Sequence, residues 1–207
     1  MRLVLATRSP DKAREIREIL GGIARLELLT LDEFGLARDP EEAGVERGQS
    51  FLDNATAKAL HFLRRTRSPV LADDSGLEVA ALAGAPGVYS KRFSGRDDLD
   101  GQELDQANNR ILLERLHDVP TAQRGAHYVC VAVLALAEDR CFAALGTCAG
   151  QILRRPRGTG GFGYDPLFFL PEAGRSFAEL APEEKNRRSH RARAFRALAP
   201  HLHHLLA

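Results

Sequence analysis

The sequence predicts an α/β protein with a mixed central β-sheet and flanking helices. Short apolar runs typical of buried strands alternate with segments whose apolar residues recur at helical spacing. Two longer apolar runs, at residues 127–137 and 140–150, are separated only by Glu138 and Asp139, which is typical of an antiparallel hairpin. Because 44% of the 207 residues are hydrophobic, the chain can build one sizeable core. We therefore expect a single domain over residues 1–207.

The chain opens with an expected strand, a tight polar turn and a helix. Residues 2–6 contain the apolar run of the strand, and residues 12–20 place their apolar side chains on one helical face. Ser9 followed by Pro10 predicts the N-cap and the first position of this helix. The same periodicities predict a strand at 26–29, a polar loop at 36–48, a helix at 50–65, a strand at 70–72, a helix at about 99–116, the hairpin, and a helix at about 189–206.

The balance of charge excludes some classes of partner. Lys and Arg number 29 and Asp and Glu number 28, which gives a net charge of +1. Because no global basic field results, we expect no nucleic acid partner, and any anionic ligand must be held locally. No apolar run approaches the roughly 18 residues that a membrane-spanning helix needs, and the first residues lack the apolar region of a signal peptide. We therefore expect a cytoplasmic protein with no membrane partner.

The three cysteines support neither a disulfide framework nor a zinc site. Cys130, Cys141 and Cys148 are odd in number and show no C-x-x-C spacing. All three fall in the apolar runs of the expected hairpin, where we interpret them as small apolar residues that fill strands.

The first candidate site is the turn between the opening strand and its helix, at residues 6–12. Such a turn presents free backbone N–H groups and the positive end of the helix dipole, so it favours an anion. Lys12, in the first helical turn, adds a mobile cation. The alternative is an ordinary connection with a solvated lysine, since the segment is no Walker A motif.

The second candidate is a pair of carboxylates, Asp73 and Asp74, at the end of an apolar strand. Ligands of α/β sheets gather at the carboxyl ends of strands, where two acids can hold Mg²⁺ or orient a water. Adjacent side chains of a strand point to opposite faces, so only one should face a given cleft unless the strand has ended. The alternative is an Asx-turn with a capping Asp.

Other polar residues could join these carboxylates. Glu41 and Glu42, in the polar loop, could bring another carboxylate to a metal, although the pair by itself would pass as surface. Asn54 and Lys58 lie about one helical turn apart on the helix at 50–65, so both can face one cleft.

The third candidate is the glycine-rich segment 158–166. It matches G-x-G-x-x-G, but it is preceded by Pro156 and closed by Asp165-Pro166, so we reject a dinucleotide fingerprint. Its glycines would let the backbone approach a flat ligand, with an aromatic face for stacking. The alternative is a flexible loop whose aromatic residues pack into the core.

The fourth candidate is the charged run 183–191. A charged run is usually a solvated helix face, but Ser189, His190 and Arg191 offer several donors at a helix start. These donors suit a ligand rich in acceptors, such as an oxo-purine. We reject a catalytic triad, because adjacent Ser and His rarely reach nucleophile-to-base geometry.

Five segments together resemble one family, the inosine/xanthosine triphosphate pyrophosphatases that remove non-standard purine nucleotides. In chain order they are LVLATRSPDK, SFLDNATAKA, LADDSGLEVAALAGAPGVYS, GTGGFGYDPLFF, and FAEL with EEKNRRSHRARAF. Each is weak alone, but the series covers nearly the whole chain and is specific. The chain departs from the pattern at Arg8-Ser9, where Gly-Asn is common, at Lys91, where many members carry Ala, and at Ala192, where Gly is frequent.

The resemblance implies a fold, an activity and an assembly. The implied fold is inosine triphosphatase-like, with two lobes around a nucleotide cleft, and the implied assembly is a homodimer. The implied reaction is Mg²⁺-dependent hydrolysis of purine nucleoside triphosphates (ITP, dITP and XTP) between the α and β phosphates, which releases monophosphate and pyrophosphate.

The resemblance also implies roles for residues. Asp74 would be proton acceptor and Mg²⁺ ligand, Glu41 or Glu42 the second metal carboxylate, and Asp73 a further candidate for metal contact. The residues implied or predicted to bind substrate are Thr7, Arg8, Ser9, Pro10, Asp11 and Lys12 around phosphate; Asn54, Lys58, Ser75 and Lys91 as further contacts; Phe162, Gly163, Tyr164 and Asp165 around the nucleoside, with Phe162 stacking on the purine; and Lys185, His190 and Arg191 at the base edge.

Three alternative functions remain to be weighed. The Maf-like nucleotide pyrophosphatases share the strand-turn-helix opening but prefer other bases, and the Ser-His-Arg and FGYDP segments argue against them. A nucleotide sensor without turnover is disfavoured by the presence of Asp73, Asp74 and Lys12. A nucleic-acid-binding module is suggested by 25 arginines, but these are balanced by acids along the chain.

Overall fold

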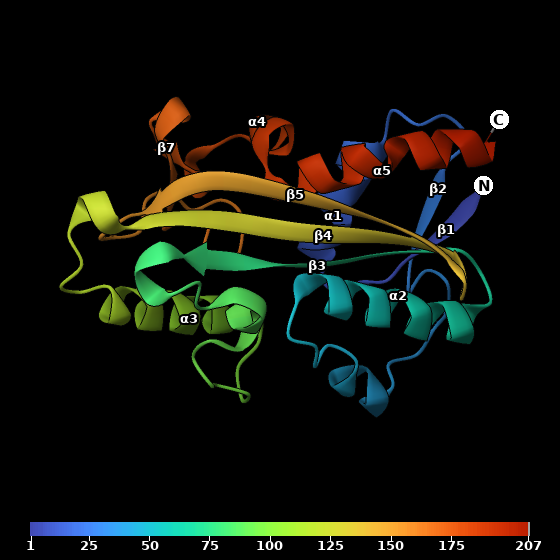
Figure 1. Cartoon of the computed structure of the whole chain (residues 1–207), viewed down its shortest axis with the longest axis horizontal. Coiled ribbons are helices and arrows are strands. Elements are labelled where there is room, and N and C mark those ends of the chain that lie inside the picture. Colours follow the sequence, from blue (N-terminus) through green and yellow to red (C-terminus); the bar gives the residue numbers. More distant parts are fainter. Residues whose placement is uncertain (207) are drawn as a thin grey trace. The chain divides into compact units, whose positions relative to one another are not determined.

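A seven-stranded mixed β-sheet forms the centre of the fold in the computed structural model (Figure 1), which describes residues 1–206 and their side chains through Leu205. Strand β1 is parallel to β2 and β3, whereas β6 is antiparallel to β5 and β7. The predicted mixed α/β class is confirmed. The strands are β1 (Arg2–Leu5), β2 (Glu27–Thr30), β3 (Val70–Val79), β4 (Gly125–Ala137), β5 (Arg140–Ile152), β6 (Phe168–Leu170) and β7 (Arg175–Ser176), in the order β2-β1-β3-β4-β5-β6-β7.

Helices flank the strands. The α-helices are α1 (Pro10–Leu20), α2 (Phe51–Thr66), α3 (Gly101–Arg115), α4 (Pro182–Arg188) and α5 (His190–Leu206). Short 3₁₀ helices connect them: η1 (Pro40–Gly44), η2 (Ala80–Leu82), η3 (Gly87–Arg92), η4 (Thr121–Gln123), η5 (Pro171–Ala173) and η6 (Phe177–Glu179).

The chain divides into two compact units. The first contains Met1–Asp74, Cys130–Gly146 and the residues from His190 to the end of α5, and the second contains Ser75–Val129 and Thr147–Ser189. Strands β3, β4 and β5 each contribute residues to both units. The inference of two lobes around a cleft stays a prediction.

One core cluster of the first unit lies between strands and helices on one face of the sheet. Leu3 and Leu5 of β1 point to the same face, because strand side chains alternate, and they pack with Ile16 of α1 and Phe195 of α5. All four side chains are essentially inaccessible to solvent. Figure 1 shows α2 on the opposite side of the strands from α5. The elements that carry the first two candidate sites are therefore fixed by buried packing.

Helix starts in the first unit are set by the residues that the sequence indicates. The hydroxyl of Ser9 accepts a hydrogen bond from the Lys12 backbone N–H at 3.3 Å, and Pro10 is the first residue of α1, as predicted. Ser50 caps α2 in the same way, accepting from the Asp53 backbone N–H at 3.1 Å. Each cap satisfies one of the backbone donors that a helix start leaves without an intrahelical acceptor.

The second unit has its own core, which is rich in aromatic side chains. The ring centroid of Tyr128 on β4 lies 4.5 Å from that of Phe168 and 5.7 Å from that of Phe177. A buried arginine, Arg124, precedes β4 and donates to the carbonyl oxygens of Leu116, Ile152 and Leu153. These bonds satisfy a fully buried guanidinium without a carboxylate.

The structure extends or corrects several predicted elements. The strand expected at 70–72 continues through Asp73 and Asp74 to Val79, and the loop expected at 36–48 contains η1. Strands β6 and β7 were not predicted, because two or three residues are too few for a periodic signal. Cys130 and Cys148 are buried as expected, but Cys141 is exposed, because alternate side chains of β5 face solvent.

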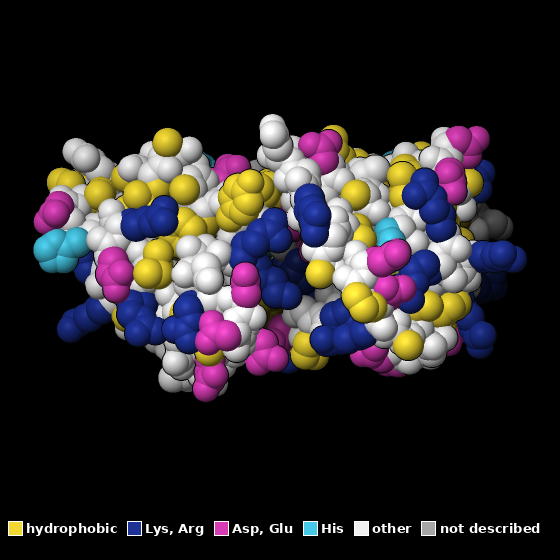
Figure 2. Space-filling view, turned by 90° about the horizontal axis from the view of Figure 1, so that it is seen from below, with side chains coloured by type: hydrophobic (Ala, Val, Ile, Leu, Met, Phe, Trp, Pro, Cys, Tyr) yellow, Lys and Arg dark blue, Asp and Glu magenta, His cyan; other side chains and the backbone are white. Residues whose placement is uncertain are grey.

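The surface carries charges of both signs. Lys and Arg side chains are interspersed with Asp and Glu side chains over the face shown in Figure 2, in keeping with the balanced composition. Within the described part of the chain, no helix combines the length and the apolar character needed to cross a membrane.

One glycine of β5 sets how closely α5 approaches the sheet. A Cβ at Gly146 would lie 2.1 Å from the His190 carbonyl oxygen and 2.4 Å from the Ala194 backbone nitrogen, so α5 would have to shift. We expect Gly146→Ala to lower the free energy of unfolding by about 3 kcal/mol, the upper part of the usual range for overpacking, measured by urea denaturation. Gly125→Ala is the matched control, because nothing lies within 4 Å of a Cβ there. Equal stability of the two variants would contradict this close approach.

Candidate active site

Asp73 and Asp74 lie at adjacent positions of β3 and have different partners. Asp73 Oδ2 is 3.1 Å from Lys12 Nζ and 3.5 Å from Arg191 Nε, and its side chain is 1% exposed. Asp74 Oδ2 instead accepts a hydrogen bond of 2.9 Å from Asn54 Nδ2 on α2. Because the strand continues past both residues, their side chains leave opposite faces of the sheet, as alternation requires.

The two aspartates have opposite pKa shifts. Burial would raise the pKa of Asp73, but Lys12, Arg191 and Lys58 together hold that pKa well below its ordinary value. Burial also raises the pKa of Asp74, and there Lys12 and Lys58 lower it only in part, so that its pKa stays above the ordinary value. Two neighbouring carboxyl groups with pKa values pushed apart are typical of sites where one group stays ionised and the other exchanges a proton.

Glu46 is a third carboxylate of this site, and the sequence did not indicate it. Its carboxylate accepts a short hydrogen bond from Lys58 Nζ. Burial would raise the pKa of Glu46, but Lys58 and Lys12 lower it below its ordinary value, while Glu46 itself contributes to the raised pKa of Asp74. We call Glu46, Asp73, Asp74, Lys12 and Lys58 the carboxylate–lysine cluster.

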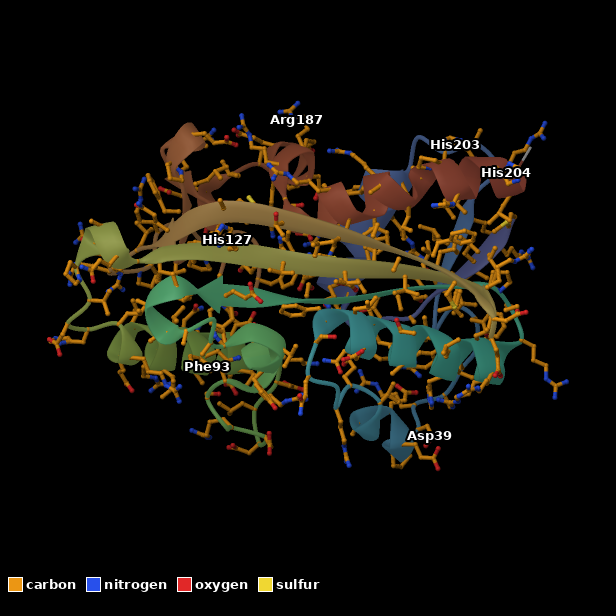
Figure 3. The ribbon with its side chains drawn as sticks, in the orientation of Figure 1. Asp39, Phe93, His127, Arg187, His203 and His204 are labelled. Atoms are coloured by element: carbon orange, nitrogen blue, oxygen red, sulfur yellow. The ribbon has the colours of Figure 1, made fainter. Side chains whose placement is uncertain are left out.

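Glu41 and Glu42 have other partners. Glu42 Oε1 accepts hydrogen bonds from Arg8 Nη2 and Arg65 Nη1, both at 2.9 Å. Glu42 also forms a capping box with Asp39 at the start of η1, where Figure 3 labels Asp39. The Glu41 side chain is exposed, and its backbone N–H donates to Asp39 Oδ1. The contacts of this pair therefore run to arginines and to the η1 cap, and they give no support to the predicted metal contact.

The turn at residues 7–12 contributes backbone groups and one cation. Thr7 Oγ1 accepts from the Ser9 backbone N–H at 3.1 Å, which shapes the turn before α1. Lys12 reaches the carboxylate–lysine cluster, whereas Asp11 pairs with Arg14 on the exposed side of the helix. The predicted anion site thus has its helix start and its lysine in place. Arg8 and Pro10 of the same turn have their own roles, since Arg8 pairs with Glu42 and Asp32 and Pro10 starts α1.

The donor set fits a hard divalent cation that also binds substrate. Residues 1–206 contain no group of three or more His, Cys, Asp and Glu side chains arranged to hold a metal by themselves. Mg²⁺ is usually bound by one or two carboxylates together with substrate phosphates and water. Asp74 and Glu46, both partly exposed oxygen donors, are the side chains that suit this role.

A second cluster lies in the second unit, around Asp165. Asp165 Oδ2 accepts from Lys185 Nζ at 2.5 Å and from the Phe162 backbone N–H at 3.0 Å, and Oδ1 accepts from the Tyr128 hydroxyl at 3.2 Å. Lys185 Nζ also lies 4.7 Å from the centroid of the Phe162 ring. Lys185 and Asp165 are buried and Phe162 is partly exposed. Asp165 therefore orders this loop and holds Lys185 next to the ring; we call Phe162, Asp165 and Lys185 the aromatic–lysine cluster.

The glycines of this loop mostly accommodate the protein's own atoms. A Cβ at Gly158 would lie 2.6 Å from the Ala178 carbonyl, and one at Gly161 would lie 2.1 Å from Asp165 Oδ2. Nothing lies within 4 Å of a Cβ at Gly163, which has a φ of +61°. These glycines make room for neighbouring atoms of the chain, whereas the space beside Gly163 is open, and the expected close approach to a flat ligand stays a prediction.

The remaining predicted residues are placed as follows. Tyr164 is buried and donates its hydroxyl to the Ser90 carbonyl at 2.7 Å, so its ring belongs to the core. Lys91 is exposed on η3, and Ser75 is partly exposed on β3, just after Asp74. These placements leave the predicted substrate contacts of Lys91 and Ser75 as predictions.

His190 and Arg191 open α5 in the first unit, and both are buried. Arg191 Nη1 donates to the buried carboxylate of Glu15 on α1 at 2.5 Å, and its Nε lies near Asp73. Burial would lower the pKa of Arg191, but Glu15 and Asp73 raise it, so the guanidinium is charged. In this structure Arg191 supports Asp73, and its predicted contact with a base edge stays a prediction.

Comparisons with known proteins agree on one family. The sequence pattern of the Ham1 family matches residues 3–201. A dITP/XTP pyrophosphatase of Thermus thermophilus is 49% identical over 200 residues, which cover 96% of this chain and 90% of that protein. A dITP/XTP pyrophosphatase of Pseudomonas aeruginosa is 48% identical over 202 residues, covering 97% and 96%. A solved HAM1 protein from Coxiella burnetii has a TM-score of 0.83 at 37% identity, covering 98% of each chain.

Proposed function

Because this chain belongs to the Ham1 family, we propose that it hydrolyses non-standard purine nucleoside triphosphates (ITP, dITP and XTP) to the monophosphate and pyrophosphate. The names of its relatives support the substrate class, since those proteins are called dITP/XTP pyrophosphatases. The observation that carries the proposal is the carboxylate–lysine cluster, in which Lys12 lies 3.1 Å from Asp73, Lys58 pairs with Glu46, and Asn54 holds Asp74.

The carboxylate–lysine cluster is the proposed binding site of the triphosphate. A triphosphate carries about four negative charges, and Lys12 and Lys58 supply positive charge within a protein whose net charge is +1. The start of α1 adds backbone N–H donors and the positive end of a helix dipole. Asp73 keeps Lys12 in place, since its buried carboxylate lies 3.1 Å from Lys12 Nζ.

We propose that Asp74 and Glu46 hold Mg²⁺ against the phosphates. When bound, Mg²⁺ neutralises phosphate charge and polarises the bond that is cleaved. Asp74 also takes the proton of the attacking water, because a carboxylate beside the metal is placed to act as general base. Asn54 orients Asp74 for this step through its amide N–H.

The aromatic–lysine cluster is the proposed site of the purine. The partly exposed Phe162 ring offers a face for stacking, and Lys185 supplies a buried positive charge beside it. A site that donates to the O6 of hypoxanthine or xanthine would meet the N6 amino group of adenine donor to donor. The unsatisfied groups would cost about 1 to 3 kcal/mol each, which favours ITP and XTP over ATP.

Three properties belong to the proposal and stay predictions: the requirement for Mg²⁺, the homodimer and the cytoplasmic location. Neither alternative nucleotide function is favoured, because the relatives at 48–49% identity are named for dITP and XTP. Hydrolysis of other bases in preference would support a Maf-like activity, and binding of ITP without turnover would support a sensor.

Phosphorus NMR of an ITP digest tests the function. With Mg²⁺ present, we expect inosine monophosphate and pyrophosphate as the products, and faster turnover of ITP, dITP and XTP than of ATP or GTP by about tenfold or more. Inorganic pyrophosphatase must be absent, so that pyrophosphate is observed directly. Release of orthophosphate together with the diphosphate would show that a different bond is cleaved, and an equal rate for ATP would refute the proposed selectivity.

A further inference from the structure

Helix α3 of the second unit holds Gly163 through both its backbone N–H and its carbonyl oxygen. Asp105 Oδ2 accepts a hydrogen bond of 2.6 Å from the Gly163 backbone N–H. One turn later, Asn109 Nδ2 donates at 2.9 Å to the Gly163 carbonyl oxygen. Residues four apart on a helix lie on the same face, so these two side chains form one clamp on one residue.

This clamp acts on the residue next to the Phe162 ring. Gly163 has a φ of +61°, a conformation that L side chains rarely adopt. The backbone N–H of Phe162 is bound by Asp165, and the N–H of Asp165 bonds back to the Phe162 carbonyl at 3.2 Å. The N–H and carbonyl of Gly163 bond instead to α3, so the loop is held both by Asp165 and by the clamp.

The side chain of Asn109 has one buried polar atom whose burial costs free energy. Its Oδ1 is buried and finds no hydrogen-bond partner among the described residues. A buried acceptor without a partner is unfavourable, and leucine or alanine would avoid it in a residue whose only role is to fill space. The amide is therefore retained for what its Nδ2 does, which is to hold the Gly163 carbonyl.

The same helix holds a second segment. Asn108 Oδ1 accepts from the Ser94 backbone N–H at 2.8 Å, and its Nδ2 donates to the Lys91 carbonyl at 3.0 Å. Phe93 of this segment lies beside α3 (Figure 3), with the Arg115 guanidinium carbon 4.5 Å from the centroid of its ring. Polar residues of one helix thus support two segments that carry predicted substrate contacts.

We propose that Asp105 and Asn109 are positioning residues for purine binding: by holding Gly163 they fix the orientation of the Phe162 ring beside Lys185. The inference rests on the proposed function, because it assigns the Phe162 ring to the base. Neither residue needs to touch the substrate. The charged acceptor makes the stronger bond, so Asp105 contributes more than Asn109.

Kinetics of four variants test the proposal. Asp105→Ala removes the acceptor, and we expect KM for ITP to rise about tenfold while kcat changes less than about twofold. Asp105→Asn retains an acceptor oxygen and is expected to restore most of the affinity. Asn109→Asp replaces a donor by an acceptor facing the Gly163 carbonyl, with little change of shape, and is expected to raise KM as well. Gln106→Ala, on the exposed side of α3, is the matched control and should leave KM unchanged.

Two further measurements separate positioning of the base from a general structural role. Inorganic pyrophosphate lacks a base, so its inhibition constant should change less than about twofold in Asp105→Ala. Hydrogen exchange of the Gly163 amide, followed by NMR, should become faster by about tenfold or more in Asp105→Ala and stay unchanged in Gln106→Ala.

Several outcomes would overturn the inference. These are a fall in kcat with KM unchanged, a parallel rise in the inhibition constant of pyrophosphate, or Gly163 exchange that is the same in Asp105→Ala and wild type. If Asp105→Ala does not fold, an unchanged KM for ITP in Asn109→Asp would overturn the inference instead. Wild-type protein that does not hydrolyse ITP at all would instead refute the proposed function, and Gly163 exchange would still decide separately whether the clamp exists.

Discussion

Asp74→Asn is expected to abolish turnover of ITP while the protein folds normally. The substitution removes the proposed base and one metal-binding carboxylate, so kcat should fall by about 10³-fold or more. The amide oxygen can still accept the hydrogen bond from Asn54, so the local geometry is retained. Initial rates with saturating Mg²⁺ measure the loss of turnover, and thermal melting followed by circular dichroism tests whether the variant folds normally.

The direction of the Asp74 pKa shift determines how Asp74→Asn should change the stability of the protein. The pKa of Asp74 is raised above its ordinary value, so its ionised form costs stability above that raised pKa. The amide that replaces this carboxyl group carries no such charge, and the variant should melt at the wild-type temperature or higher at neutral pH. An inactive variant that melts far lower would show a structural role, and a variant with wild-type kcat would place the base elsewhere.

Asp73→Asn is the contrasting variant, because its neighbour has the opposite shift. The pKa of Asp73 is lowered, so its ionised form stabilises the fold at any pH above the ordinary value near 3.8, and this contribution is lost as the pH falls. The substitution leaves Lys12 and Arg191 without their shared carboxylate, and breaking a buried pair costs about 3 to 5 kcal/mol. Asp73→Asn should therefore lower the melting temperature, which Asp74→Asn should not.

Glu46→Gln is expected to change the dependence of activity on Mg²⁺. If Glu46 and Asp74 hold the metal together, loss of one carboxylate should raise the Mg²⁺ concentration for half-maximal activity by about tenfold or more. The change keeps the side-chain shape, and an amide oxygen can still accept from Lys58. Initial rates over a Mg²⁺ titration, at ITP concentrations above KM, measure the effect.

Two control variants separate Glu46 from the carboxylates that the sequence indicated. Glu41→Gln should leave the Mg²⁺ titration unchanged, because Glu41 is exposed. Glu42→Gln should weaken the contacts to Arg8 and Arg65 and reduce stability, again without moving the Mg²⁺ midpoint. A shifted Mg²⁺ midpoint in Glu41→Gln or Glu42→Gln, with no shift in Glu46→Gln, would show that Glu41 or Glu42, and not Glu46, binds the metal.

The sequence predicts well those features that are determined by neighbouring residues. Ser9 and Pro10 predict the start of α1 because a cap and a fixed φ act within one turn. The alternation rule predicts that Asp73 and Asp74 separate, and in the structure they do. Asn54 and Lys58 likewise share a helix face that contacts the carboxylates, as their spacing predicts.

Features set by distant contacts are harder to predict. Aspartate is depleted in strands, so the strand was expected to stop at Ala72. It continues to Val79, and the charge of the buried Asp73 is balanced by Lys12 and Arg191, which come from distant parts of the sequence. Glu46 is brought to Lys58 by a turn in which the Gly48 backbone N–H donates to Asn54 at 2.7 Å. Hydrophobic periodicity does not predict such a turn. The only local indication in this segment is Gly48, two residues before the Ser50 cap.

The glycine-rich loop shows a third kind of limit. The segment suggests ligand contact throughout, yet Gly161 exists to make room for Asp165, and Tyr164 belongs to the core. Sequence alone cannot separate a glycine that admits a ligand from one that admits the protein's own carboxylate. That distinction needs the position of the neighbouring atoms.

The low exposure of three of the lysines has a practical consequence for chemical labelling. The chain has only four lysines, and Lys12, Lys58 and Lys185 have side chains 19%, 12% and 6% exposed, each beside a carboxylate. Lys91 is exposed. Among the lysines, acylating reagents, fluorescent dyes and amine-coupled sensor chips should therefore react first at Lys91.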